Sequence, residues 1–375
     1  MSLVIVIGCV AAAGYQLFAI LACLRFLSRR DPAGTRTPPV SILKPIHGRD
    51  PEFDEAIRSH ARIDYPEFEV LFCAASPDDP AMAPIRQLAR DFPDRAIRVV
   101  EARTEAPNGK VGRLIDLANA ARHDTLLMND SDIRVEPAYL RAVTAPLEDP
   151  AIGVVTCLYR ARANHAPAIL EAVGIATDFA PSVLVAPFAG VREFGLGSTM
   201  VFRRADLAAA GGFEALREYI ADDYQLARRI TGLGRRVHLS RTIVETSLQG
   251  ETWAEVWSHQ LRWHRTIRVT RGAYAGLFIT HATVWASVAA AAGMTNLALG
   301  VLAARMAMAI VAGIGVMRCP LTARYFWLIP FRDLFGSAVW AAGLFGSTVT
   351  WRGRELPLRP DGRIASPLSE RRPQQ

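Results

Sequence analysis

The stretch Leu126–Arg134, with the sequence LLMNDSDIR, joins an apolar run to a short acidic turn. The apolar run predicts a buried strand, and Asp130 and Asp132 follow at its end, two residues apart. Residues with this spacing lie on the same side of an extended chain, so both carboxylates face one way. Carboxylate oxygens are the ligands that hard divalent cations prefer. The stretch therefore predicts a site for a hard divalent cation, although Asp-x-Asp also occurs as a plain strand cap.

The residues on the N-terminal side of this turn alternate between short apolar runs and longer segments with a helical period. Strands are expected at 40–43, 69–73, 96–100 and 125–128, and helices from about 51, over 82–91 and over 110–122. Strands that alternate with helices indicate an α/β fold, with a mostly parallel sheet and helices on both faces. Ligands of such sheets bind beyond the carboxyl ends of the strands, where the acidic turn lies.

The two ends of the chain are strongly apolar. Hydrophobic residues make up 51% of the 375 residues, and residues 3–24 carry no charge. That run is long enough to cross the ~30 Å hydrocarbon layer of a membrane. A cleaved signal peptide is less favoured, because no basic residue precedes the run. We expect an N-terminal transmembrane anchor over 1–30, a catalytic domain over 38–271, membrane segments over 272–350 and a basic cytoplasmic tail over 351–375.

Within the C-terminal apolar zone, spans are expected at 278–294 and 297–317, the second with Arg305 inside it. The third apolar segment, 326–349, is broken by Pro330 and by Arg332 and Asp333, which favours a re-entrant or interfacial segment over a crossing. Arginines that follow residue 24 and fill the tail favour a cytoplasmic position for the catalytic domain and the tail. The expected location is a bacterial inner membrane.

The charge and cysteine patterns exclude several other classes. The formal net charge is +7, but no basic face with interleaved aromatic residues is present, so lipid headgroups are favoured over nucleic acid as partners. The five cysteines are scattered and lack CxxC spacing. Neither a disulfide framework nor a zinc site is indicated.

Four further places carry candidate site residues. Asp78 and Asp79 follow the second strand, where they either cap a helix or contact a nucleotide. Lys110 lies at a Gly-flanked helix start, where it either meets a phosphate or is an ordinary solvated lysine. Asp222 and Asp223 precede a predicted helix; such acids are usually caps, but Asp223 is also placed as a general base.

The last candidate is a helix over about 253–270 that contains the sequence Ser258-His-Gln-Leu-Arg-Trp263. Its tryptophans and arginines are typical of a membrane-interface helix. A functional interpretation assigns Arg262 to a departing diphosphate and Trp263 to a sugar or acceptor ring. Both interpretations hold together if a lipid acceptor enters from the membrane interface.

With these residues in order, the chain resembles the ceramide glucosyltransferase family, the membrane-bound family-21 glycosyltransferases of the GT-A fold. The resemblance extends along nearly the whole chain and rests on seven short motifs: Ser41-Ile-Leu-Lys-Pro45, Asp64-Tyr-Pro66, Asp78-Asp-Pro80, Asp130-Ser-Asp132-Ile-Arg-Val135, Gly195-x-Gly197, Ile220-Ala-Asp-Asp-Tyr224 and Arg262-Trp263. The resemblance implies a UDP-sugar donor, Mg²⁺ or Mn²⁺, and a lipid alcohol acceptor.

The family's motif residues correspond to single positions of this sequence. The resemblance implies that Asp78 or Asp79 contacts the nucleotide and that Asp130 and Asp132 bind metal and diphosphate. It also implies that Asp223 is the catalytic base. His259–Trp263 matches a (Gln/Arg)xxArgTrp motif, with His259 where the family has Gln or Arg. Gln260 is one residue out of register and is expected to point elsewhere on the helix.

The Asp-Ser-Asp turn looks most like the branch linked to hopanoid biosynthesis, which implies transfer of GlcNAc or Glc to a polyol hopanoid. A ceramide acceptor is the alternative. A processive polysaccharide synthase and a catalytically silent UDP-sugar-binding membrane protein are further alternatives. The sequence has too few predicted membrane segments to form the polymer channel of a processive synthase. Only His259 supports the catalytically silent binding protein.

Overall fold

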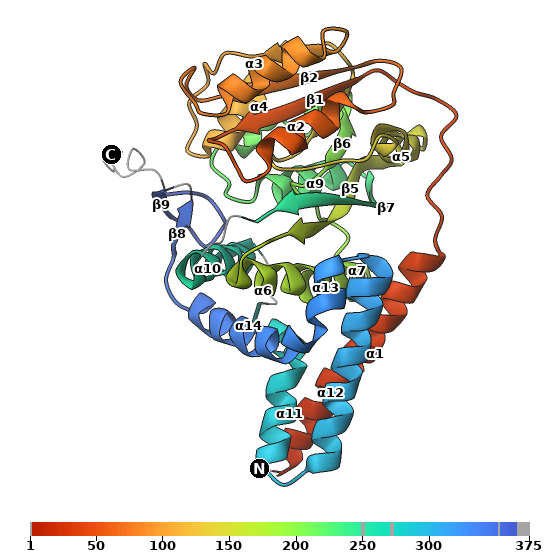
Figure 1. Ribbon diagram of the computed structural model, residues 1–375, viewed down its shortest axis with the longest axis vertical. Helices are drawn as coiled ribbons and strands as arrows, with labels where there is room; N and C mark the ends of the chain where they lie inside the picture. Colours follow the sequence, from red (N-terminus) through yellow and green to blue (C-terminus); the bar gives the residue numbers. More distant parts are fainter. Residues whose placement is uncertain (1, 249–251, 271–273, 352, 366–375) are drawn as a thin grey trace. The chain divides into compact units, whose positions relative to one another are not determined.

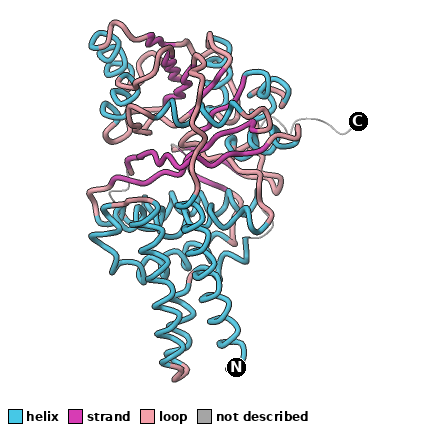
Figure 2. Tube along the Cα trace, turned by 90° about the vertical axis from the view of Figure 1, so that its right-hand side faces the viewer, coloured by secondary structure: helices cyan, strands magenta, loops and turns pink. Residues whose placement is uncertain are grey.

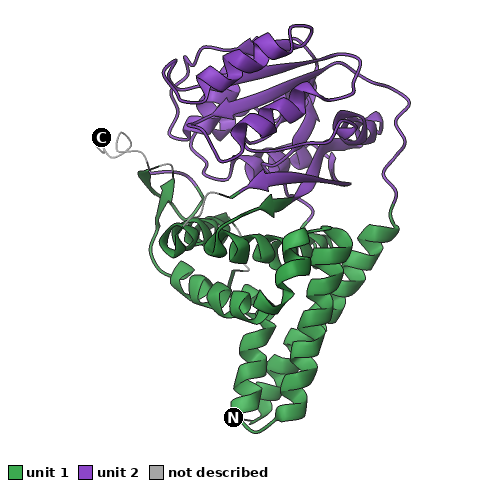
Figure 3. Cartoon of the chain, in the orientation of Figure 1, with its two compact units in different colours: residues 1–29, 160–191, 248–362 green, residues 30–159, 192–247, 363–375 purple. Residues whose placement is uncertain are grey.

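The computed structural model describes residues 2–248, 252–270, 274–351 and 353–365. The chain forms two compact units, drawn in two colours in Figure 3. The sheet unit comprises residues 30–159 and 192–247 with the segment that begins at Arg363, and the helical unit comprises residues 1–29, 160–191 and 248–362. Two stretches of the predicted catalytic domain, 160–191 and 248–271, therefore belong to the helical unit.

The sheet unit is built on a seven-stranded sheet with the order β3-β2-β1-β4-β6-β5-β7 (Figure 1). The strands β1, β2, β3 and β4 are parallel, with Val40 opposite both Phe68 and Thr125, while β6 runs antiparallel to β4 and β5. The strand bounds are β1 Val40–Ile46, β2 Phe68–Ala74, β3 Ala96–Val99, β4 Thr125–Met128, β5 Ile152–Arg162, β6 Met200–Arg203 and β7 Arg236–Ser247.

Helices cover both faces of this sheet because its central strands are apolar on both sides. On β1, Ile42 packs with Phe53 and Ile85, while its neighbour Leu43 packs with Leu114 on the opposite face. This alternation follows from the two-residue repeat of a strand. The helices of the sheet unit are α2 Phe53–Ala61, α3 Met82–Asp91, α4 Gly109–Ala120, α5 Tyr139–Thr144, α8 Arg204–Ala209 and α9 Asp222–Gly232, with 3-10 turns at Ala145–Glu148 and Phe213–Leu216. The predicted α/β class with a mostly parallel sheet is confirmed.

The helical unit is almost entirely helix, as the cyan trace in Figure 2 shows. Its helices α1, α11 and α12 lie side by side, and the hairpin β8–β9 completes the unit (Figure 1). The bounds are α1 Ser2–Ser28, α6 Ala166–Gly174, α7 Ala180–Val185, α10 Trp253–Thr270, α11 Ala282–Ala291, α12 Thr295–Ala309, α13 Pro320–Tyr325, α14 Ile329–Gly343, β8 Thr348–Trp351 and β9 Arg354–Pro357. Stretches of π-helix at Ile175–Phe179 and Ile310–Val316 and 3-10 helix at Ala186–Ala189, Tyr274–Thr280 and Phe326–Leu328 extend or join these helices.

Among the described residues, three helical stretches are long and apolar enough to cross a membrane: Ser2–Ser28, Ala166–Ala189 and Thr295–Val316. A fourth arises if Tyr274–Thr280 and Ala282–Ala291, which meet at 62°, are counted together. The first and third stretches match the predicted spans at 3–24 and 297–317. The stretch 166–189 was not predicted, because Glu171 and Asp178 interrupt its apolar character.

Candidate active site

The acidic turn at the end of β4 is held by contacts to three other segments of the sheet unit. The amide of Asp130 donates to the carbonyl of Gly197 at 3.2 Å. The hydroxyl of Ser131 donates to Asp50 Oδ2 at 2.6 Å, and the hydroxyl of Thr246 donates to the Asp132 carboxylate. These contacts leave the Asp130 side chain 44% exposed. The turn is therefore rigid, and it presents one partly exposed carboxylate.

Lys110 lies against this turn from the first turn of α4. Its Nζ lies 2.8 Å from Asp130 Oδ1 and 3.3 Å from Asp222 Oδ2, and its side chain is only 14% exposed. Asn108 caps α4 by accepting from the amides of Lys110 and Val111, at 3.0 and 3.3 Å, which fixes where the lysine begins. Burial alone lowers the pKa of a lysine, but the neighbouring carboxylates outweigh it and raise the pKa of Lys110. The solvated-lysine interpretation is therefore wrong.

Asp223 lies in the first turn of α9. Its Oδ2 accepts from the amide of Gly197 at 2.9 Å, and its Oδ1 accepts from the amide of Tyr224 at 2.7 Å. Burial raises the pKa of Asp223 to about 6; Asp222 acts in the same direction, and Lys110 opposes it. A helix start by itself lowers the pKa of a carboxyl group, and at Asp223 burial outweighs that effect. A carboxylate with this pKa is still mostly ionised at pH 7, so it suits a general base.

Two glycines let these segments approach one another. A Cβ on Gly197 would lie 3.1 Å from Asp130 Oδ2, 3.3 Å from Lys110 Nζ and 3.5 Å from Asp223 Oδ2. A Cβ on Gly195 would lie 2.7 Å from the Asp223 carbonyl oxygen. The Gly195-x-Gly197 motif thus brings together Asp130 and Asp223, which are far apart in the sequence.

Sequence reasoning missed Lys44, which points into the protein from β1 and is fully buried. Its Nζ donates to Asn129 Oδ1 at 2.9 Å and to the Asp130 carbonyl at 3.0 Å, and lies 3.4 Å from His60 Nε2. His60 Nδ1 lies 2.9 Å from the Ala56 carbonyl and so carries the proton, which leaves Nε2 as an acceptor. Burial lowers the pKa of Lys44 to about 7. Lys44 therefore supports the backbone of the acidic turn.

A compositional signal existed for both lysines. Of the 43 basic residues in the chain, Lys44 and Lys110 are the only lysines, and all others are arginine. Both lysines contact Asp130, one through its carbonyl and the other through its carboxylate. The chain thus places its only two lysines at the acidic turn.

The two aspartates after β2 differ in their contacts. Asp79 Oδ2 accepts from the amide of Gly48 and its Oδ1 from the amide of Ala81, both at 2.9 Å. Asp79 therefore ties two loops together, which fits the capping interpretation. Asp78 is exposed at this edge of the sheet. Of this pair, Asp78 is the better candidate for contact with a nucleotide.

The acidic turn fits a hard divalent cation only in part. In the described segments no group of three or more His, Cys, Asp or Glu side chains is arranged to hold a metal. Burial raises the pKa of Asp132 to about 6, and the charges of Asp50 and Asp130 act in the same direction, so negative charge is concentrated here. A Mg²⁺ or Mn²⁺ ion typically uses one or two carboxylates and takes its other ligands from water and substrate phosphates. Asp130 and Asp132 match that donor set.

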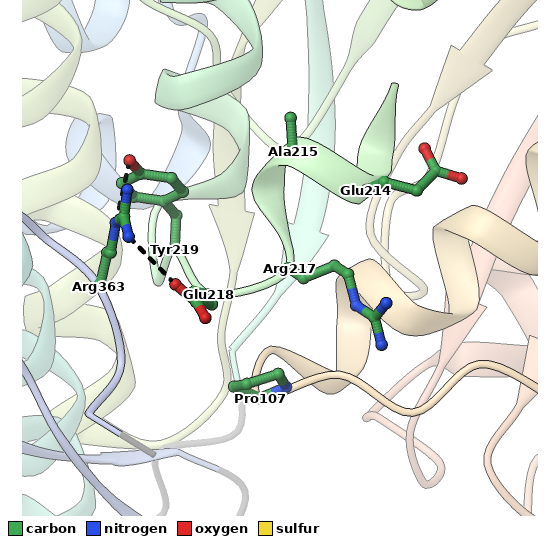
Figure 4. Close-up of a pocket in the computed structure, with 7 residues that line it drawn as sticks. All are labelled: Pro107, Glu214, Ala215, Arg217, Glu218, Tyr219 and Arg363. Atoms are coloured by element: carbon green, nitrogen blue, oxygen red, sulfur yellow. Dashed lines mark hydrogen bonds and ion pairs between the residues drawn. The ribbon is translucent and has the colours of Figure 1, made fainter. Parts of the chain in front are cut away.

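A pocket of about 360 Å³ borders the loop that leads into α9 (Figure 4). Arg363 reaches Glu218 Oε2 at 3.3 Å and lies over the ring of Tyr219, 5.2 Å from its centroid. The amide of Ile364 donates to the Glu218 carbonyl at 2.7 Å, and Asn108 Nδ2 donates to the Tyr219 carbonyl at 2.8 Å. The loop that leads to Asp222 and Asp223 at the start of α9 is therefore held from both sides.

The remaining predicted residues lie on α10, in the helical unit, and are described within that unit. His259 Nδ1 lies 2.6 Å from Glu171 Oε1, and Gln260 Nε2 donates to the same oxygen at 2.9 Å. Gln260 was expected to point elsewhere; in fact both side chains reach one carboxylate. Trp263 packs on His259, with ring centroids 4.7 Å apart, and Arg262 is on the same helix. Glu171 was missed because its partners lie about 90 residues away.

Comparison with known proteins agrees with this geometry. The sequence model of glycosyl transferase family 21 matches residues 4–364. The chain belongs to this family. The family 21 chain is 29% identical over 246 residues to ceramide glucosyltransferase 1 of Caenorhabditis elegans, which covers 64% of this chain and 52% of that protein. It is 31% identical over 127 residues to a ceramide glucosyltransferase of Komagataella phaffii, over 32% and 25% of the two chains. The chain thus spans about half the length of the first relative.

The fold has a solved counterpart. The mannosyltransferase PcManGT from Pyrobaculum calidifontis, in complex with GDP-Man and Mn²⁺, superposes with a TM-score of 0.55 over 91% of this family 21 chain and 98% of its own, at 19% identity. At this identity the likeness concerns the fold. The predicted GT-A fold and the predicted family are both confirmed, whereas the hopanoid branch stays a prediction.

Proposed function

We propose that this family 21 protein is a membrane-bound inverting glycosyltransferase that moves one sugar from a UDP-sugar to a hydroxyl group of a lipid. The observation that carries the proposal is the convergence of Asp130, Lys110 and Asp223 on Gly197 in the sheet unit. Family membership and the names of the ceramide glucosyltransferase relatives support a lipid acceptor.

The donor would bind at the carboxyl edge of the sheet. Asp78, at the exposed end of β2, would contact the nucleotide, and Lys110 would bind the diphosphate. Asp130 and Asp132 would hold Mg²⁺ or Mn²⁺, and the Mn²⁺ bound by PcManGT supports this assignment. The metal would supply positive charge to the departing diphosphate.

Asp223 would act as the base. As the acceptor oxygen forms its bond to the anomeric carbon, the Asp223 carboxylate would accept the hydroxyl proton, while the bond to UDP breaks with inversion. Its two amide contacts, from Gly197 and Tyr224, fix the carboxylate for this role. Asp222 would keep Lys110 in place.

The acceptor is proposed to be a polyol hopanoid, with GlcNAc or Glc as the sugar, as the likeness of the Asp-Ser-Asp turn to the hopanoid-associated branch suggests. Ceramide is the second candidate, because both relatives described above are ceramide glucosyltransferases. The apolar helices of the helical unit support a membrane location, and the arginines after α1 favour a cytoplasmic catalytic unit in a bacterial inner membrane. Arg262 and Trp263 are proposed to contact the diphosphate and a sugar or acceptor ring.

The test is reconstitution of the full chain in lipid nanodiscs with UDP-Glc or UDP-GlcNAc, Mn²⁺ or Mg²⁺, and either lipid. We expect one sugar on each product lipid by mass spectrometry, and no product with EDTA. Asp223→Asn should lower turnover by about 10²–10⁴-fold. The matched control Asp94→Asn, an exposed carboxylate of the same unit, should not. Near-normal turnover by Asp223→Asn with bound donor would exclude this base, and longer sugar chains would favour the processive alternative.

A further inference from the structure

A chain of polar side chains runs through the apolar helical unit. From Glu171 on α6 it continues to Gln260 on α10, whose Oε1 accepts from Arg332 Nη2 at 3.1 Å. Arg332 Nε lies 3.4 Å from Asp178 Oδ2, and Asp178 also binds Arg305. Charged groups are rare among apolar helices, where they are costly unless paired, and they often mark a functional site.

At one end of this row of polar side chains, Arg305 and Asp333 have their hydrogen-bonding groups paired. Arg305 is 0% exposed and binds Asp333, with Nε 3.0 Å from Oδ1 and Oδ2 and Nη2 2.7 Å from Oδ1. Its Nη1 donates to the Thr177 carbonyl at 3.1 Å, and Asp333 Oδ2 accepts from the hydroxyl of Thr283 at 2.7 Å. This end joins α12, α14 and the π-helical stretch 175–179, and it needs no ligand to explain it.

The Arg332 end differs. Arg332 is 7% exposed; within the described part of the chain its Nη1 has no hydrogen-bond partner, and its Nε has only the 3.4 Å ion pair with Asp178. Gly336 lies directly beside it, since a Cβ there would be 2.7 Å from Arg332 Nη1 and 3.2 Å from His281 Nε2. His281 Nδ1 also has no partner among these residues. A buried donor without an acceptor is costly, so Arg332 Nη1, beside the bare backbone of Gly336, indicates a place for an oxygen atom from outside the chain.

Aromatic side chains accompany this end. Trp263 lies 4.7 Å from the His259 ring and 6.2 Å from the Phe179 ring, measured between centroids. His259 keeps 33% of its side chain exposed, and Asp178 keeps 23%. The cluster therefore combines buried polar groups with partly exposed rings, the combination that suits a molecule with a polar end and an apolar body.

The charges decide which polar end fits. The cluster holds three carboxylates, those of Glu171, Asp178 and Asp333, against the guanidinium groups of Arg305 and Arg332. With its histidines, His259 and the adjacent His281, neutral, the sum of these charges is −1. A phosphate would meet a negative surrounding, whereas a hydroxyl or amide carries no charge and both donates and accepts hydrogen bonds.

We infer that the cluster Glu171, Gln260, Arg332 and Asp178, together with His259 and Trp263, binds the uncharged hydroxyl- or amide-bearing end of the lipid acceptor and discriminates against a lipid phosphate. The inference rests on the proposed function and narrows its acceptor class. Arg332 Nη1 donates to an oxygen of the lipid, the partly exposed Asp178 carboxylate accepts from a hydroxyl, and the rings contact the apolar body.

The test measures lipid binding without any donor, so that it does not depend on transfer. The full chain, purified in detergent, is titrated with ceramide and with ceramide 1-phosphate, two probes that share one apolar body. We expect the wild-type chain to prefer ceramide. Arg332→Gln should weaken ceramide binding about tenfold, the effect of one lost hydrogen bond to a charged group. The matched control Arg324→Gln, an exposed arginine on the neighbouring α13, should bind as wild type.

A second variant keeps the test decisive if Arg332→Gln fails to fold. Glu171→Gln retains a similar shape and the acceptor oxygen for its two partners but removes one negative charge, so ceramide 1-phosphate should bind about fivefold tighter than to wild type. Equal wild-type affinity for the two lipids, or unchanged binding in both variants, overturns the inference. If ceramide binds as expected but no lipid receives a sugar, the proposed function fails and the inference stands.

Discussion

Replacing Lys110 by methionine should affect metal and donor binding in opposite directions. Lys110 occupies Asp130 Oδ1 at 2.8 Å, and that carboxylate is a proposed metal ligand. Methionine fills a similar volume without charge, so Asp130 loses its cation and becomes fully available to the metal. The diphosphate of the donor, by contrast, loses the cation that we assign to it.

The magnitudes follow from exposure. Asp130 is 44% exposed, and an ion pair this exposed is worth about 1 kcal/mol, which corresponds to roughly fivefold tighter Mn²⁺ binding in the variant. A charge-assisted hydrogen bond to the diphosphate is worth about 1.5–3 kcal/mol, so the KM for the UDP-sugar should rise roughly 10–100-fold. Asp222 is 7% exposed and would lose its cation, which should cost about 3 kcal/mol of stability.

The assay is titration of Mn²⁺ into the purified full chain by calorimetry, without nucleotide, followed by donor kinetics at saturating Mn²⁺. Arg86→Met, which removes an exposed cation from α3 of the same unit, is the control and should change neither quantity. Unchanged or weaker Mn²⁺ binding in Lys110→Met would show that the lysine and the metal do not share Asp130. An unchanged donor KM would remove Lys110 from the diphosphate site.

Three further predictions concern the same unit. Lys44→Met should lower turnover about tenfold, because it removes the hydrogen bond that supports the Asp130 carbonyl. The Tm measured by thermal denaturation should change little, because the variant also removes a buried charge. A lower Tm with unchanged turnover would contradict this prediction. Gly197→Ala should lower turnover roughly tenfold, because its Cβ would lie 3.1 Å from Asp130 Oδ2, whereas Gly232→Ala, with nothing within 4 Å, should not. Turnover should rise with pH through about 6 and then level off, because Asp223 must lose its proton to act as base; a flat profile from pH 5 to 7 would exclude this.

The sequence predicted the elements whose hydrophobic pattern is local. The helices over 82–91 and 253–270 and the strand over 125–128 agree with the structure to the residue. The stretch 166–189 was not predicted because its acidic residues have distant partners: Asp178 pairs with Arg305 and Arg332, more than 100 positions away, and Glu171 pairs with His259, 88 positions away. The residues that neighbour an acid in the sequence do not indicate such a distant partner. A buried and paired acid therefore cannot be distinguished from an exposed one by the local pattern.

The candidate site residues likewise divide into those that a local sequence pattern indicates and those that depend on distant segments. The Asp-Ser-Asp turn was recognised because an apolar run ends abruptly in acids, and Asp223 because it begins a helix. Lys44 was missed because it lies inside an apolar strand, and its partners come from elsewhere: Asn129 directly follows β4, and His60 is on α2. The raised pKa of Asp223 also could not be predicted, since it depends on burial by segments distant in the sequence.

The use of lysine at Asp130 has a physical reason. An arginine presents a planar fork that reaches several acceptors spread along a segment. Arg204 does this, since its two terminal nitrogens donate to the carbonyls of Ala118, Ala121 and His123. Lys44 instead donates from one nitrogen to Asn129 Oδ1 and to the Asp130 carbonyl, with His60 Nε2 3.4 Å away, in a fully buried space that suits a compact group. Lys110 likewise bridges two carboxylates through one atom, and in the proposed function its flexible stem would let that atom move to the diphosphate while Asp130 binds the metal. In a chain whose other basic residues among Lys and Arg are all arginine, the two lysines thus lie where several acceptors meet one compact nitrogen.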